Sequence, residues 1–154
     1  NQENIDAWKP TLSRIDNEIA YFDESREIHL YIGENRSFGS SIETIGSHTT
    51  LYDEDKWRLL DEAENGKIGS LVVAGDKRKR VIVFTFVVAG ERMVSISEAR
   101  KGMLSAYFSR DPNLFVLGLM KEVFMHANTE RVESELRSTL NDLSAALLSE
   151  INEQ

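Results

Sequence analysis

The 154-residue chain has no cysteine, few prolines and no long apolar run. Without cysteine, it cannot form disulfides, use a thiolate nucleophile or bind zinc through sulfur. Its nine glycines form neither a phosphate-binding loop nor a dinucleotide-binding fingerprint, which argues against the common nucleotide-dependent enzymes. No apolar stretch reaches the roughly 18 residues that a bilayer-spanning helix needs. Hydrophobic residues still make up 41% of the chain, which is typical of a globular domain.

Basic residues are also scarce, with 18 Lys and Arg against 26 Asp and Glu, so the net charge is −8. Nucleic-acid binding is not expected, because its affinity comes from Lys and Arg displacing counterions. The start, Asn1-Gln2-Glu3, shows no Met and no signal-peptide pattern, which predicts a fragment or a processed protein. Membrane contact is therefore expected only through segments beyond this sequence.

The first half of the chain predicts a helix, two strands and a second helix. Apolar residues spaced three and four apart, from Ile5 to Phe22, predict an N-terminal helix within 1–24. Alternating apolar residues predict a strand over 26–33, and a weaker strand follows over 37–46. Asp53 is the N-cap expected for a helix over 53–65, with Gly66 just past its end.

The second half predicts three strands followed by three helices. The strands are expected over 67–74, 80–89 and 92–96. Ser95 and Glu98 form a capping box that begins a helix ending near residue 108. Asp111-Pro112 predicts the start of a buried helix over 112–127. Asn128 caps a final helix whose apolar seam comprises Val132, Leu136, Leu140, Leu143, Leu147 and Ile151.

These elements predict one α+β domain over 1–154, because strands and helices are segregated along the chain. The expected architecture is a roughly five-stranded antiparallel sheet with helices on one face. Residues 1–24 supply the N-terminal helix, 26–96 the sheet with the inserted helix 53–65, and 97–154 the C-terminal helices. The apolar seam of the last helix favours a dimer interface or coiled coil.

No motif for catalysis or metal binding stands out. His29, His48 and His126 lie on different elements without the spacing of a metal site. The acidic runs lie on the exposed face expected for the 53–65 helix, and no Gly-x-Ser-x-Gly elbow is present. We therefore predict no catalytic residue, metal or cofactor. An enzyme whose site is assembled in space, from residues distant in sequence, stays open as an alternative.

The order of long helix, two strands, helix, three strands and exit helix resembles the PAS-like sensor domains of bacterial membrane receptors, including the single-Cache type. The resemblance implies a periplasmic or extracellular signalling domain that dimerises through its terminal helices. A small-molecule or anionic ligand would bind between the sheet and the 53–65 helix. Tyr31 and Trp57 would form aromatic walls, and Arg58 or Arg78 would contact an anion.

A second interpretation is a small acidic dimeric protein-interaction module in the cytoplasm. Low mass, low pI, α+β content and an amphipathic C-terminal helix are similar to those of type III secretion chaperones. A sensor predicts stabilisation by a small molecule, whereas a chaperone predicts tight binding of an extended peptide.

Overall fold

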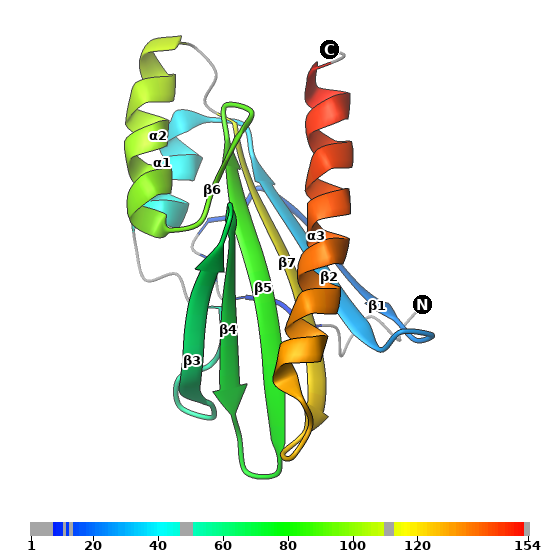
Figure 1. Ribbon diagram of the computed structural model, residues 1–154. Helices are drawn as coiled ribbons and strands as arrows, with labels where there is room; N and C mark the ends of the chain where they lie inside the picture. Colours follow the sequence, from blue (N-terminus) through cyan, green and yellow to red (C-terminus); the bar gives the residue numbers. More distant parts are fainter. Residues whose placement is uncertain (1–7, 11, 13, 47–50, 110–112, 153–154) are drawn as a thin grey trace.

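The computed structural model describes residues 8–10, 12, 14–46, 51–109 and 113–152. Within them, all strands join one antiparallel sheet of seven strands (Figure 1). The strands are β1 (Asn17–Asp23), β2 (Ile28–Asn35), β3 (Arg58–Asn65), β4 (Ile68–Ala74), β5 (Arg78–Val88), β6 (Glu91–Met93) and β7 (Leu114–Phe124). The helices are α1 (Phe38–Gly46), α2 (Ile96–Ser109) and α3 (Thr129–Asn152). The α+β class is confirmed, with seven strands where about five were expected.

The strand that comes last in the sequence lies in the middle of the sheet. The strand order is β1-β2-β7-β5-β4-β3, and the short β6 pairs with β5. Gly118 of β7 is paired with Tyr31 of β2 on one side and with Phe84 of β5 on the other. The free edges of the sheet are therefore β1 on one side and β3, together with the short β6, on the other.

Helices cover both faces of the sheet, where the sequence predicted one. On β5, Ile82 and Phe86 face a core shared with α1 and α2, whereas Val81 and Val83 face a core shared with α3. We call these the α1/α2 face and the α3 face (Figure 1). The long apolar run of β5 explains the difference, because a strand that is apolar on both sides has to be covered on both sides.

The predicted N-terminal helix is wrong where the structure describes it. Residues 17–23 form β1, which pairs with β2 from Asn17↔Glu34 to Asp23↔Ile28. The three-and-four spacing concealed an alternation, in which Ala20 and Phe22 lie on one face and Ile19 and Tyr21 on the other. Residues 1–7 lie outside the described part of the chain.

The predicted strand over 37–46 is also wrong, because these residues form α1. The Ser37 hydroxyl accepts a hydrogen bond from the Ser40 backbone N–H at 3.1 Å, as an N-cap does. Phe38, Ile42 and Ile45 then follow at helical spacing and pack on the α1/α2 face.

The predicted helix over 53–65 is wrong, because residues 53–57 form only a hydrogen-bonded turn. The Asp53 carboxylate accepts the Asp55 N–H at 2.9 Å, and the Asp53 carbonyl accepts the Trp57 N–H at 2.9 Å. Residues 58–65 then form β3. Gly66 has φ +66 and opens a two-residue hairpin loop to β4, so it is a turn glycine and not a helix end.

The predicted helix over 112–127 is the central strand β7. Its apolar run satisfies its backbone hydrogen bonds with β2 and β5 and buries its side chains on both faces. Short apolar runs do not distinguish a buried strand from a buried helix. Asp111 and Pro112, the expected start of the helix, lie outside the described residues.

Other predicted elements are confirmed. The strands expected over 26–33, 67–74, 80–89 and 92–96 correspond to β2, β4, β5 and β6 within a few residues. The Asn128 side chain caps α3 by accepting the Glu130 N–H at 3.1 Å. Along α3, Leu136 and Leu140 are fully buried against the sheet, while the Ile151 side chain lies outside the described residues.

Candidate functional site

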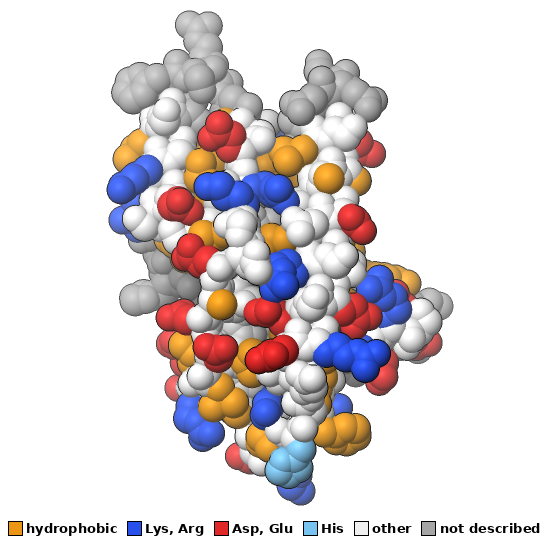
Figure 2. Space-filling model, in the orientation of Figure 1, with side chains coloured by type: hydrophobic (Ala, Val, Ile, Leu, Met, Phe, Trp, Pro, Cys, Tyr) orange, Lys and Arg blue, Asp and Glu red, His pale blue; other side chains and the backbone are white. Residues whose placement is uncertain are grey.

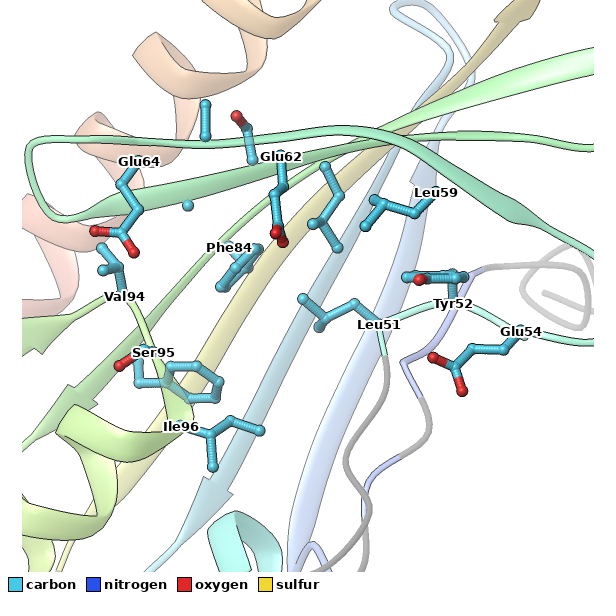
Figure 3. A pocket seen from close by; sticks show the side chains of 15 residues that line it. Leu51, Tyr52, Glu54, Leu59, Glu62, Glu64, Phe84, Val94, Ser95 and Ile96 are labelled. Carbon is cyan, nitrogen blue, oxygen red and sulfur yellow. The ribbon is translucent and has the colours of Figure 1, made fainter.

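A cavity of about 580 Å³ lies on the α1/α2 face near the β3 edge (Figure 3). Its volume is in the range of small-molecule sites. Strands β3, β4 and β5 form its floor, and residues 51–54 and the junction between β6 and α2 form its walls. It is lined by Leu51, Tyr52, Glu54, Leu59, Glu62, Ala63, Glu64, Gly69, Ser70, Leu71, Phe84, Phe86, Val94, Ser95 and Ile96.

The floor of the cavity is aromatic and apolar. Phe84 and Phe86 alternate on β5, and their ring centroids lie 6.1 Å apart at an interplanar angle of 69°. Leu71 on β4 is buried beside them. Tyr52 and Leu51 approach the same space from the other side (Figure 3).

The start of α2 holds one wall in place. The Ser95 hydroxyl accepts the Glu98 N–H at 3.0 Å, and the Glu98 carboxylate accepts the Val94 N–H at 3.1 Å. This is the capping arrangement expected from the sequence, and it fixes the backbone of the segment that carries Val94, Ser95 and Ile96 to the cavity.

The charged groups at the cavity are all acidic. Glu62 and Glu64 project from β3 to the side of the sheet that carries Phe84 (Figure 3), because they pair with Leu71 and Gly69 across the hairpin. Neither carboxylate forms a hydrogen bond or an ion pair with another described residue. The cavity is therefore an apolar hollow with a negative rim. Figure 2 shows the opposite face of the molecule, the one covered by α3, where acidic side chains lie over the middle of the sheet with basic side chains above and below them.

A second hollow of about 430 Å³ surrounds His29, between Trp8, Phe22, Arg80 and Glu122. The His29 Nδ1 accepts the backbone N–H of Trp8 at 3.0 Å, so the ring is neutral. Its ring lies 4.4 Å from that of Phe22. Burial and the nearby Arg80 lower the pKa of His29, while Glu122 opposes them. This hydrogen bond attaches the N-terminal segment to β2.

The four residues predicted to bind ligand do not form one common site. Tyr31 is fully buried and donates its hydroxyl hydrogen to Glu18 at 2.7 Å, so it offers no surface to a ligand. Burial and this hydrogen bond raise the pKa of Tyr31. Burial also raises the pKa of Glu18, but the Tyr31 hydrogen bond and the Lys9 ammonium outweigh it and leave that pKa below its usual value.

The other three lie where β3 begins and β4 turns into β5. Trp57 packs against Gly75 and lies under the guanidinium of Arg80 at 4.2 Å. Arg58 shares a shallow hollow with Trp57, and Arg78 lies over Phe124 at 4.8 Å. None of the four lines the cavity of 580 Å³.

Sequence reasoning missed Glu62, Glu64 and Phe84 as site residues. Their role depends on the β3–β4 hairpin, which the helix prediction concealed. Asn65-Gly66 followed by the apolar run of β4 was the available signal, since a glycine there suits a two-residue hairpin. With β3 taken as a strand, alternation puts Glu62 and Glu64 on one face.

Comparisons with protein-family models, curated proteins and solved structures found no match. Within the described ranges, no group of three or more His, Asp and Glu side chains is placed to hold a metal ion. Among the described helices, none combines the length and apolar character needed to cross a membrane.

Proposed function

We propose that this chain is a ligand-sensing domain that binds a small molecule in the cavity beside β3. The cavity itself is the observation that carries the proposal. Its aromatic floor offers the apolar contact area on which small-molecule sites depend, and its rim supplies polar groups that fix orientation.

The lining also gives binding a means of acting on the fold. It comes from three parts of the chain, namely the β3–β5 sheet, residues 51–54 and the junction of β6 with α2. A ligand that contacts all three parts binds more tightly when they are close together than when they are apart. It therefore shifts the population toward the closed arrangement, by the difference in its affinity for the two. In the PAS-like reading, that shift passes to the signalling helices of a receptor.

The experiment is a thermal-shift screen of metabolites on the native chain and on two matched variants. Leu59→Trp fills the cavity mouth, whereas Leu60→Trp changes an exposed neighbour that does not line it. A true ligand stabilises the native chain by about 2.7 kcal/mol at a hundredfold excess over its dissociation constant. The stabilisation should persist in Leu60→Trp and disappear in Leu59→Trp. Hits that are insensitive to Leu59→Trp contradict the proposal.

The receptor setting is a separate part of the proposal. It includes a periplasmic or extracellular location and a homodimer formed through the C-terminal helix α3. The apolar seam of α3 packs on its own sheet through Leu136 and Leu140, so a dimer would have to use other surfaces of that helix. Reading the gene on both sides of this segment tests the setting, because a receptor requires apolar segments of about 20 residues there.

One observation favours the alternative of a protein-interaction module. The edge strand β1 exposes Ile19 and Tyr21, at 62% and 51% of their surface, beside an open backbone edge. Such an edge can accept another strand. Tight binding of an extended peptide, without any response to metabolites, would favour this function over sensing.

A further inference from the structure

The chemistry of the cavity points to the charge of its ligand. Its described lining contains three carboxylates and no Lys, Arg or His. The two predicted anion contacts, Arg58 and Arg78, do not line it. An anionic ligand would therefore meet repulsion at the rim and find no counterion, whereas a cation would be attracted.

The aromatic floor supports the same sign. Cations bind over the faces of aromatic rings, and quaternary ammonium groups are recognised by cages of such rings. Here the half-buried Phe84 ring packs edge to face on the buried Phe86 and faces the cavity, and Tyr52 enters from the opposite wall (Figure 3). Rings from two sides beside carboxylates are a combination that suits an organic ammonium ion better than a hydrated metal ion, which prefers oxygen ligands.

The placement of Glu62 and Glu64 on this face also calls for an explanation. Positions on the α1/α2 face of β4 and β5 are occupied by apolar residues such as Leu71 and Phe86. At the equivalent positions of β3, two carboxylates stand without a basic partner among the described residues. Charges can protect an exposed edge strand such as β3 from aggregation, but Asp61 on the opposite face already supplies a charge to that edge.

We propose that the ligand is an organic cation whose ammonium group is held between Glu62, Glu64 and the rings of Tyr52 and Phe84. This inference rests on the proposed function, since it names the class of ligand for the same cavity. The apolar part of the ligand lies against Leu51, Leu59 and Leu71.

The test compares two probes of equal shape by calorimetric titration of the native chain. The first is choline, and the second is its uncharged analogue in which carbon replaces the quaternary nitrogen. We expect the dissociation constant of choline to be at least about tenfold lower than that of the uncharged analogue. High salt should weaken the binding of choline and leave the binding of the analogue unchanged, because screening acts only on the charged probe.

Matched variants locate the effect. The double change Glu62→Gln and Glu64→Gln removes both charges while keeping side-chain size, and it should abolish the preference for choline. Asp61→Asn removes the neighbouring charge on the α3 face and should keep the preference. Edge protection alone would raise aggregation in the double variant without changing either affinity.

Three results would overturn the inference. Equal binding of the two probes shows a cavity that does not discriminate charge, which leaves the proposed function intact. A preference for choline that survives in the double variant places the cation elsewhere. Binding of neither probe excludes ammonium recognition of this size, while hits of the metabolite screen that depend on Leu59 keep the ligand-binding function separate.

Discussion

The tip of the Phe84 ring lies over Gly69, close enough that a Cβ on Gly69 would stand 2.4 Å from Cζ. The two residues are paired across β4 and β5. The missing side chain of Gly69 is therefore the space that lets the ring lie flat on the sheet and keeps the cavity above it open.

We expect Gly69→Ala to push the Phe84 ring into the cavity. The ring tip can move at modest cost, so the loss of stability should stay within the 1–3 kcal/mol typical of overpacking. Ligand affinity should fall much further. Gly39→Ala is the control, because nothing lies within 4 Å of its added Cβ and it sits in α1, where alanine is favoured by about 0.5–1 kcal/mol. Denaturant titration and ligand titration of both variants check this, and unchanged affinity in Gly69→Ala contradicts it.

The hydrogen bond between Trp8 and His29 predicts a pH dependence of stability. Because the pKa of His29 lies below its unfolded value of about 6.5, the unfolded chain binds this proton more readily than the folded chain. The free energy of unfolding should therefore fall as pH is lowered through this value toward the folded pKa. His29→Asn keeps an acceptor near Nδ1 without a titrating ring and should flatten this part of the profile.

Urea unfolding across a pH series measures the effect. The charged groups around His29 are Arg80 and Glu122, with Glu24 at the rim of the hollow, and all three are retained in the variant. His126→Asn, which changes an exposed histidine outside this hollow, is the matched control. If the pH dependence of stability disappears in His126→Asn and persists in His29→Asn, the assignment to His29 is ruled out.

A side chain at Gly118 should press on the ring of Trp8. An added Cβ would lie 3.0 Å and 3.2 Å from two atoms of the buried Trp8 ring, which packs across the middle of β7. We expect Gly118→Ala to cost about 1–3 kcal/mol and to displace that ring toward water. In a Trp57→Phe background, fluorescence reports Trp8 alone and should shift to longer wavelength. An emission spectrum identical to that of the parent would refute the expected displacement.

The two sheet edges should behave differently in solution. Edge β3 carries Asp61, Glu62 and Glu64 and a bulge near Leu60, which are features that deter strand pairing. Edge β1 has no bulge in its register and exposes Ile19 and Tyr21. Antiparallel pairing of β1 with a second copy about Ala20 sets Ile19 against Tyr21 and opposes no like charges.

We therefore expect the native chain to self-associate at high concentration through β1. Ile19→Lys with Tyr21→Lys should shift it toward monomer in sedimentation experiments, because charges on an edge strand oppose pairing. Leu59→Lys on the other edge serves as the control. Association that Leu59→Lys weakens and the β1 changes do not would place the contact at β3.

Local signals predicted the parts of this fold that local chemistry determines. The predicted Ser95–Glu98 capping box and the predicted Asn128 cap involve residues within three positions of each other. The turn between β5 and β6 is equally local, since Ala89 and Gly90 both have positive φ, as that hairpin requires.

The errors arise where distant residues decide the outcome. Residues 114–124 are a strand because β2 and β5 lie on either side to satisfy their backbone, and no window of local sequence contains that information. The cavity could not be predicted from the sequence for the same reason. Tyr52, Glu62 and Phe84 become neighbours only once the register of β3, β4 and β5 is known.

The central place of β7 has a consequence for how the protein is made. While the ribosome is still adding residues before Leu114, β2 and β5 each lack the neighbour that separates them in the finished sheet. The β1–β2 hairpin and the three strands β3, β4 and β5 therefore remain two separate units, in which β2 and β5 each have one unpaired edge. Closure of the sheet is a long-range event that joins residues about ninety positions apart, such as Tyr31 and Gly118, and long-range pairings of this kind fold slowly. A nascent or truncated chain that ends before β7 exposes the unpaired edges of β2 and β5, which are prone to aggregate. We therefore expect chaperones to bind this protein mainly before β7 has been synthesised.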